Sequence, residues 1–299
     1  MKVFVTGATG FVGSHLTRVL LQLGHEVTCV GRSPKMKISH ENLHYIQGDT
    51  TQSGAWQEAV KKTDAAVNLA GVNIFKRWDA VYKQALYDSR ILTTRHLVEG
   101  LPENGETLLI STSAAGFYGQ RNDDILMENE PPGQDFLANL CKDWEKEASA
   151  AENKGVRVVI TRFGVVLGKG GGALAPMIPL FKWFLGGPLG NGKQWFPWIH
   201  LEDLAAAMCF ILDHEKIRGP LNFTAPVPVR QKDFSKALGR QLGRPAVLPA
   251  PSFMIRLIMG ELGKSLLFSQ KVIPDRLIRE GYKFKFMEVQ TALEEIVGE

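Results

Sequence analysis

The sequence predicts an α/β protein built on a doubly wound parallel sheet, with a smaller C-terminal substrate-binding domain. Three observations indicate this class. Short apolar runs alternate with segments of helical periodicity through the first half of the chain. Several of these runs are hydrophobic without alternation, as strands buried on both faces of a parallel sheet are. A glycine-rich turn separates the first apolar run from the first helical segment.

The first predicted unit is a strand, a glycine turn, a helix and a second strand. The run Lys2–Val5 predicts the first strand, and Val27–Val30 predicts the second. Between them, Phe11–Leu23 carries apolar residues at helical spacing, and Gly24 ends that segment. This order is typical of a βαβ unit.

The same alternation continues along the chain to residue 162. Strands are expected at Leu43–Gln47, Ala65–Leu69, Thr107–Ser111 and Val156–Arg162, and helices at Gln52–Lys62, Trp78–Leu101 and Phe136–Asn153. After Gly168, closely spaced glycines and prolines interrupt the chain, and the alternation of strand-like and helix-like segments ends. We therefore expect one domain over residues 1–168, to which a later segment such as 195–225 returns, and a smaller, mostly helical domain over 169–299.

The composition excludes several classes of protein. Of the 299 residues, 44% are hydrophobic and 22% are charged, which is typical of a globular domain. The net charge is +4 without any long Lys/Arg run, so a nucleic-acid partner is not expected. We find no signal peptide and no apolar run near the roughly 18 residues of a membrane span, so we expect a cytoplasmic protein without a membrane partner. Three scattered cysteines predict neither disulfides nor a metal site.

The segment Thr6–Gly13 has the spacing of a phosphate-binding turn. Glycine allows a sharp turn there and lets backbone amides approach a pyrophosphate. The helix that begins near Phe11 adds free N–H groups and a partial positive charge. We therefore expect Gly7, Gly10, Phe11 and Val12 to contact the diphosphate of a dinucleotide in a Rossmann domain. The alternative is a purely structural tight turn.

The end of the second strand indicates which dinucleotide is bound. An acidic residue that would favour NAD is absent from the segment Gly31-Arg32-Ser33. Arg32 can pair with a 2′-phosphate, and Ser33 can donate a hydrogen bond to it. The sequence therefore favours NADP, whereas the alternative makes Arg32 an ordinary solvated cation. Asp49 either accepts from the adenine amino group or caps a turn.

These segments together resemble the extended short-chain dehydrogenase/reductases. That family's motifs are matched at Thr6–Gly13, Asn68–Gly71, Ser111–Ser113 with Tyr118-Gly119, and Trp198–Ala205. Over nearly the whole chain, a narrower resemblance is to the nucleoside-diphosphate-sugar epimerase-like subfamily. It is carried by Asn68–Gly71, Trp78, Ser89-Arg90, Arg162–Gly168, Gly170–Gly172, Phe196–His200 and Lys271–Pro274.

The resemblance implies which side chains lie against NADP. These residues are Arg32, Leu69, Ala70, Arg90 and Val165, and the small residue Gly71 lets the backbone run beside the cofactor. For Arg90, the alternative is a salt bridge with a nearby carboxylate.

One departure from the family concerns the reaction itself. Typical members use a Tyr-x-x-x-Lys pair, in which the lysine lowers the pKa of a tyrosine that transfers a proton. Alignment on Trp144-Glu145 puts Leu137 and Cys141 at these two positions. Lys142 is one residue away and points about 100° around the helix.

Four side chains remain as catalytic candidates. Ser113 or Thr112 can polarise a carbonyl oxygen, and Tyr118 can supply a phenol, although a role in shaping its loop is favoured. His200 titrates in the working range, but a helix cap or a core hydrogen bond is the favoured role.

Two function hypotheses follow. The first is an NADP-dependent oxidoreductase or sugar-nucleotide epimerase-like enzyme acting on a small carbonyl or carbinol substrate. The alternative is a non-catalytic NADP(H)-binding sensor or assembly factor. The segments Gly186–Gly192 and Trp195–Trp198 either close the substrate cleft or clamp the two domains together. A homodimer through the two long helices is left open.

Overall fold

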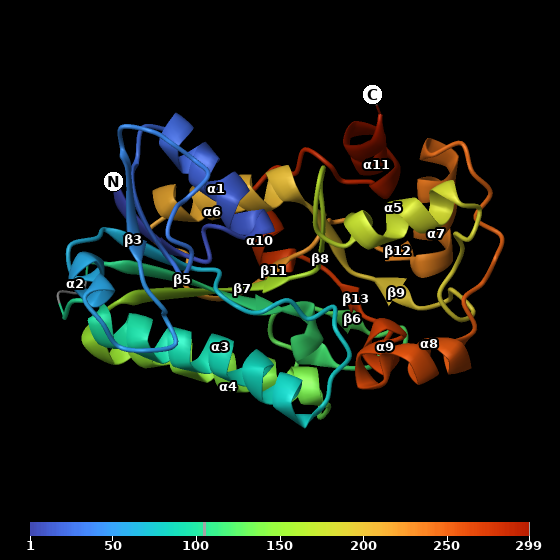
Figure 1. The fold of residues 1–299 in the computed structure, drawn as a ribbon, viewed down its shortest axis with the longest axis horizontal. Helices are drawn as coiled ribbons and strands as arrows, with labels where there is room; N and C mark the ends of the chain where they lie inside the picture. Colours follow the sequence, from blue (N-terminus) through green and yellow to red (C-terminus); the bar gives the residue numbers. More distant parts are fainter. Residues whose placement is uncertain (104–105, 299) are drawn as a thin grey trace.

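The computed structural model describes residues 1–103 and 106–298 of the chain. Within these ranges a parallel sheet has the strand order β11-β7-β5-β4-β1-β2-β3. Its strands are β1 (Lys2–Thr6), β2 (Glu26–Gly31), β3 (Leu43–Gln47), β4 (Ala65–Asn68), β5 (Leu108–Ala114), β7 (Arg157–Phe163) and β11 (Gly219–Phe223). This sheet, with helices on both faces, confirms the predicted doubly wound α/β class (Figure 1).

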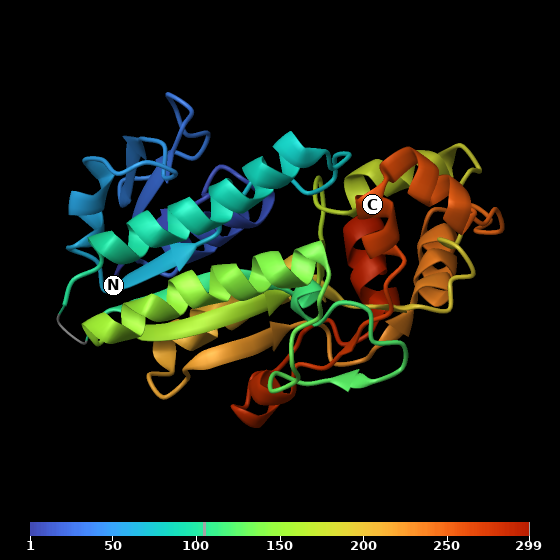
Figure 2. The ribbon, with the colours of Figure 1, turned by 90° about the horizontal axis from the view of Figure 1, so that it is seen from below.

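Two helical layers cover the sheet. Figures 1 and 2 show α1 (Phe11–Gln22), α6 (Leu201–Asp213) and α10 (Asp275–Arg279) on one face, and α3 (Ala80–Gly100) and α4 (Phe136–Ser149) on the other, where α2 (Trp56–Val60) packs against α3. Successive residues of β1 pack into the two different hydrophobic cores. Val5 belongs to the core under α1 and α6, and Phe4 belongs to the core that contains Trp56. Their burial drives the assembly.

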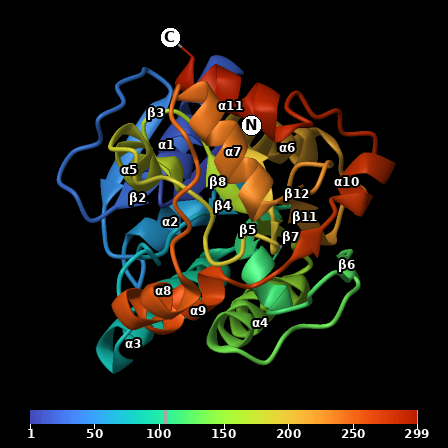
Figure 3. The same cartoon turned by 90° about the vertical axis from the view of Figure 1, so that its right-hand side faces the viewer.

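The remaining elements form a smaller body at the end of the molecule opposite β3 (Figures 1 and 3). Its helices are α5 (Leu174–Lys182), α7 (Gln231–Gln241), α8 (Ser252–Met259), α9 (Glu261–Leu266) and α11 (Val289–Val297). Short strands and 3-10 helices connect it to the sheet: β6 (Ile125–Leu126), β8 (Val165–Leu167), β9 (Trp195–Phe196), β10 (Trp198–His200), β12 (Val229–Arg230), β13 (Lys271–Val272), η1 (Ala115–Tyr118) and η2 (Ala150–Lys154). In the described part of the chain, no helix combines the length and apolar character needed to cross a membrane.

Three boundaries differ by three or more residues from the sequence expectations. The helix expected at 52–62 covers only Trp56–Val60, because Asp49 accepts from Thr51 N at 3.0 Å and holds the preceding residues in a turn. β5 continues to Ala114, because its pairing with β7 continues to that residue. The helix expected to reach residue 153 ends at Ser149 and continues as η2.

Candidate cofactor site

The glycine turn after β1 is packed too tightly for any side chain. Gly7 has a φ of 68°, and a Cβ there would lie 2.6 Å from the carbonyl carbon of Leu69. A Cβ on Gly13 would lie 2.3 Å from Gly7 O. Gly10 precedes α1 and provides no side-chain cap, so amides of the first helical turn are left for solvent or a ligand. The cradle therefore has the shape and the donors that a diphosphate requires.

The hydroxyl of Thr6 fixes the backbone opposite this turn. It accepts hydrogen bonds from Leu69 N at 3.1 Å and Ala70 N at 3.2 Å, and it donates to Asn68 Oδ1 at 2.7 Å. The Asn68 amide in turn donates to Thr94 Oγ1 at 2.8 Å, which ties β4 to α3. Sequence reasoning did not identify this positioning role of Thr6, although the residue lies within the motif.

A cavity of about 200 Å³ opens beside the turn at the carboxyl ends of β1, β2 and β4. Seven residues predicted to bind the cofactor line it, namely Gly7, Gly10, Gly31, Arg32, Leu69, Ala70 and Gly71. Its other lining residues are Thr9, Val30, Gly48, Asp49, Thr50, Thr51, Val72, Ser89 and Thr93. Phe11, Val12, Ser33, Arg90 and Val165 lie outside this lining, so their contact with a cofactor stays a prediction.

Arg32 is exposed at the end of β2, and the exposed Lys35 and Lys37 follow it. Burial acts to raise the pKa of the facing Asp49, but hydrogen bonds from Thr51 and the charge of Arg32 bring it below its usual value. Asp49 Oδ1 accepts from Thr51 Oγ1 at 2.7 Å, which supports the turn-capping alternative. The Ser33 carbonyl accepts from Tyr45, which anchors the loop. This edge of the cavity can receive an added phosphate.

Arg90 lies outside the cavity lining but brings a positive charge from α3 to Gly71 and Val72, which line it. Desolvation lowers the pKa of its guanidinium. The guanidinium donates to Leu86 O at 3.1 Å and Val72 O at 3.2 Å, and it stacks on Trp144 with 5.3 Å to the ring centroid. A Cβ on Gly71 would lie 3.0 Å from Arg90 Cζ. Among residues 1–103 and 106–298 no carboxylate pairs with Arg90, so the salt-bridge alternative finds no support.

The Gly170–Gly172 run packs against the start of α1. A Cβ on Gly171 would lie 2.3 Å from Phe11 Cδ2, and one on Gly172 would lie 2.7 Å from Phe11 Cε1. The Phe11 ring therefore occupies the space of a side chain at Gly171 and Gly172, whereas Gly170 has open space around its Cβ position and a φ of 77°. β8, which contains Val165, pairs with β10 and joins this loop to the second body.

The positions of the family's proton-transfer pair are apolar. Leu137 packs in a cluster that includes Trp78 and Leu262, and burial raises the pKa of Cys141 to about 12. Neither side chain can exchange a proton at neutral pH. The sequence analysis reached the same conclusion from residue type alone.

The two hydroxyls of β5 differ in availability. Ser113 is buried and donates to Glu145 Oε1 at 2.7 Å, so its proton is engaged. Thr112 Oγ1 is also buried and has no hydrogen-bond partner within the described ranges. Thr112 therefore has an unused donor, although its oxygen is buried and the residue lies outside the cavity lining.

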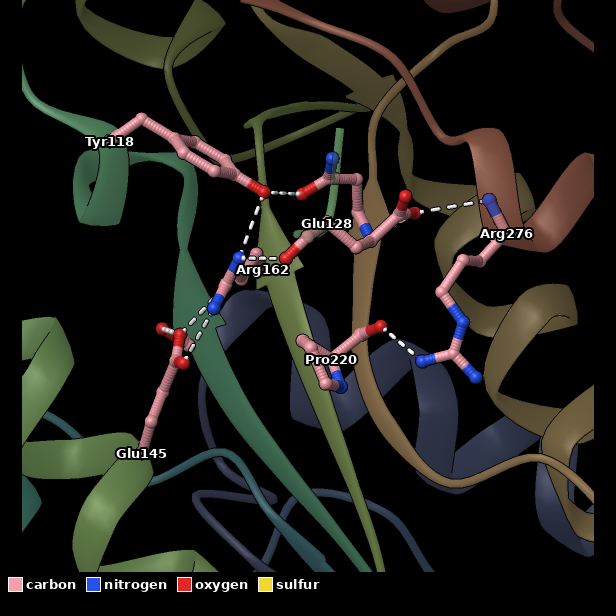
Figure 4. A network of polar contacts seen from close by, with 8 residues as sticks. Tyr118, Glu128, Glu145, Arg162, Pro220 and Arg276 are labelled. Carbon is pink, nitrogen blue, oxygen red and sulfur yellow. Dashed lines mark hydrogen bonds and ion pairs between the residues drawn. The ribbon is translucent and has the colours of Figure 1, made fainter. Parts of the chain in front are cut away.

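Tyr118 is fully buried in a polar network (Figure 4). Its hydroxyl donates to Asn222 Oδ1 at 2.6 Å and accepts from Arg162 Nη1 at 2.9 Å. Burial raises the pKa of Tyr118 to about 12. Arg162 also pairs with Glu145, so the network joins β7, α4 and the loop after β5. This placement supports the loop-shaping alternative for Tyr118.

His200 and Trp198 have structural surroundings. His200 Nδ1 accepts from Glu202 N at 3.2 Å and caps α6, while Nε2 lies 3.0 Å from Glu295 Oε2. Burial lowers the pKa of His200. Trp198 belongs to the core shared with Phe234, which supports the clamp alternative for this aromatic stretch.

Comparison with known proteins gives the same assignment over the whole chain. The model described as the NAD dependent epimerase/dehydratase family matches residues 3–223, and a domain of unknown function (DUF1731) matches residues 250–296. The chain is 40% identical over 302 residues to "Epimerase family protein SDR39U1 homolog, chloroplastic" of Arabidopsis thaliana, covering 99% of this chain and 87% of that protein. It is 36% identical to epimerase family protein YfhF of Bacillus subtilis, covering 100% of this chain and 99% of that protein.

A solved structure extends the likeness to three dimensions. The crystal structure of human epimerase family protein SDR39U1 (isoform 2) with NADPH superposes with a TM-score of 0.84 at 34% identity, covering 99% of each chain. The glycine cradle, the cavity beside it and these matches agree with one another. The chain therefore belongs to the NAD-dependent epimerase/dehydratase family, within the extended short-chain dehydrogenase/reductases, as an NAD(P)-binding protein of the SDR39U1 type.

Proposed function

We propose that this protein binds NADP(H) in the cavity beside the glycine turn and acts as an oxidoreductase or epimerase-like enzyme on a small carbonyl or carbinol substrate. The observation that carries the proposal is the cradle at Gly7 and Gly13, where a single added carbon would collide with backbone. The Gly10 amide is bonded within the turn at 3.0 Å, so the donors offered to a diphosphate are the uncapped amides of the first turn of α1. The human SDR39U1 relative was crystallised with NADPH, which supports the choice of nucleotide.

Each side chain has a separate task in this proposal. Arg32 pairs with the 2′-phosphate through charge-assisted hydrogen bonds. Arg90, which lacks an acidic partner in the described ranges, places its positive charge near the polar groups of the bound nucleotide. Thr112 donates its free hydroxyl to the substrate oxygen. When bound, NADP(H) supplies the hydride chemistry.

The proton must come from an unconventional source. Leu137 and Cys141 cannot provide it, and Ser113 and Tyr118 are held in buried hydrogen bonds. We therefore infer that the substrate oxygen exchanges its proton with water that enters the cleft. Turnover is then slower than a positioned general acid would permit, since such an acid contributes about 10²–10⁴-fold.

A panel assay tests this proposal. NADPH fluorescence is followed with aldehydes, ketones and nucleotide sugars in turn, using wild type and a Thr112→Val variant. Turnover that falls in the variant while NADPH binding is kept supports the enzyme. Tight NADPH binding with no turnover across the panel contradicts it.

The apolar cluster around Leu137 favours a second candidate function, a sensor or assembly factor that reads the redox state of the nucleotide. It predicts that a partner protein is retained differently in the presence of NADPH and NADP. Pull-downs with each form test this, and identical partner sets in both would rule the sensor out.

A further inference from the structure

Many of the exposed large apolar side chains belong to two segments, one in and after α5 and the other before and in α8. Both helices lie at the end of the molecule opposite β3 (Figures 1 and 3). We call these side chains the apolar band. Its members are Leu180, Trp183, Phe184, Leu185, Val247, Leu248, Phe253, Met254, Leu257 and Ile258. Single exposed apolar residues are ordinary, but a gathered set of large ones marks an interaction surface.

The two segments of the apolar band are joined through their backbones. Leu248 N donates to Gly186 O at 3.4 Å, and Ala250 N donates to Pro188 O at 2.9 Å. A Cβ on Gly187 would lie 2.0 Å from Leu248 O, so the two backbones are too close for a side chain at residue 187. α8 then begins directly after this pairing. The band is therefore one continuous, rigid feature.

The apolar side chains of the band point into solvent. Trp183 is 77% exposed and Leu257 is 74% exposed. In α8 only Ile255 is buried, so the outer apolar side of this amphipathic helix has no intramolecular partner in the described structure. Phe184 has a φ of 62°, a conformation that residues with side chains rarely adopt, and its ring is half-exposed beneath the Arg244 guanidinium.

The two segments that carry the apolar band contain cations but no acidic residue, and the nearest acids in the sequence are Asp233 and Glu261, which adjoin the second segment. Residues 153–201 and 234–260, which contain the whole band, include no Asp or Glu. They carry exposed cations at Lys182, Lys236, Arg240, Arg244 and Arg256. A second copy docked through the same surface would bring these cations together, which costs energy. The complementary partner is an anionic surface.

We propose that the apolar band docks on a lipid bilayer that contains anionic phospholipids. Trp183, Phe184 and the outer side of α8 enter the boundary between headgroups and acyl chains, and Arg244 and Arg256 meet the lipid phosphates. Aromatic and aliphatic side chains flanked by Lys and Arg are the pattern of proteins that lie on a membrane without crossing it. The sequence expectation of no membrane partner considered spanning segments, whereas this contact is peripheral.

Vesicle co-sedimentation of the full chain tests the proposal. Vesicles of phosphatidylcholine with phosphatidylglycerol are compared with vesicles of phosphatidylcholine alone, at low and high salt. We expect binding to the anionic vesicles only, and we expect it to weaken as salt screens the cations. Absence of binding to anionic vesicles at low salt would overturn the proposal.

Variants locate the contact on the band. Trp183→Asp and Leu257→Asp should each lower the partition into anionic vesicles by about tenfold or more, because each removes a large inserted side chain. Arg244→Glu with Arg256→Glu should have a similar effect. Matched controls are Leu23→Asp, at an exposed apolar residue after α1, and Lys216→Glu, and both should bind like wild type. Equal binding by band and control variants would place the contact elsewhere and refute the proposal.

A measurement on wild type does not depend on the folding of any aspartate variant. Brominated acyl chains quench tryptophans that enter the bilayer, so wild-type emission should fall and a Trp183→Phe variant should lose much of that quenching. A dimer that dissociates in Trp183→Asp, without any vesicle binding by wild type, would identify a second copy as the occupant and overturn the proposal. None of these readouts requires NADP(H), so their outcome is independent of the proposed function.

Discussion

The carboxylate of Glu145 on α4 and the guanidinium of Arg162 on β7 form a two-point ion pair, with Nε–Oε1 and Nη2–Oε2 distances that are both 2.9 Å (Figure 4). Both side chains are buried or nearly so, and the same carboxylate accepts a hydrogen bond from Ser113. Arg162 also donates to Tyr118 and to Glu128 O. Ser113 and Tyr118 are therefore part of an internal scaffold, whereas Thr112 is not.

Glu145→Gln should destabilise the protein by about 3–5 kcal/mol, because it leaves the Arg162 charge buried without its counter-ion. Glu147→Gln is the control, since Glu147 pairs with the half-exposed Arg95 and should cost less than about 1 kcal/mol. Urea unfolding of both variants measures the difference. Equal free energies of unfolding for the two variants would show that the buried ion pair contributes no more than the exposed one.

Gly7→Ala should abolish dinucleotide binding. A methyl group there requires the Leu69 backbone to move, and it also meets a positive φ. Gly24→Ala is a matched control, because Gly24 has a φ of 80° but an open space around its Cβ position. The Gly24→Ala control should lose only about 1 kcal/mol of folding stability, because its alanine must adopt a positive φ. It should bind NADPH normally in a fluorescence titration, and loss of binding in both variants would mean that strain alone is responsible.

Arg90→Met should weaken NADPH binding while leaving the free energy of unfolding of the unliganded protein unchanged or higher. A desolvated cation without an acidic partner in the described structure is costly, and an apolar side chain of similar length removes that cost. Arg95→Met, at an exposed position on the same helix, should change NADPH affinity little. Calorimetric titration and thermal unfolding check the two effects, and unchanged NADPH affinity in Arg90→Met would remove this residue from the site.

Stability should fall as the pH drops below the ordinary histidine pKa of about 6.5. Burial lowers the pKa of His200 in the folded state, so the unfolded chain binds the proton more readily and acid favours unfolding. The pKa values of His15 and His25 are lowered as well, mainly by burial. His200→Asn keeps an oxygen cap for α6 and should reduce the pH dependence of Tm. His44→Asn, at an exposed histidine, should leave the dependence intact; an unchanged dependence in His200→Asn would contradict this account.

The fold and the glycine turn were predictable because they depend on local patterns. Repeated βα units follow from periodicity, and the turn between Thr6 and Gly13 follows from glycine spacing next to a strand. Likewise, Leu137 and Cys141 revealed the missing acid/base pair by residue type. The structure added the reason for Gly7 and Gly13, namely the backbone that occupies their Cβ space.

The interior networks could not be predicted because they depend on residues far apart in the chain. Tyr118 bonds to Asn222, and Glu145 bonds to Arg162, through contacts that no local pattern records. The apolar band is similar: its two segments belong to one end of the molecule because residues 186–190 pair with residues 248–250. Whether an apolar side chain is exposed depends on how the elements pack. From the sequence alone, these apolar residues are therefore expected to lie in the core.

Binding of NADPH and NADH to wild type and to Arg32→Ala is the most direct measurement of the central claim. Charge-assisted bonds to the 2′-phosphate, discounted for the exposure of Arg32, are expected to give about a tenfold preference for NADPH. Wild type should therefore bind NADPH saturably and more tightly than NADH, and the variant should lose that preference while it still binds NADH. No saturable binding of NADPH to wild type, or a preference for NADPH that persists in Arg32→Ala, would contradict the account.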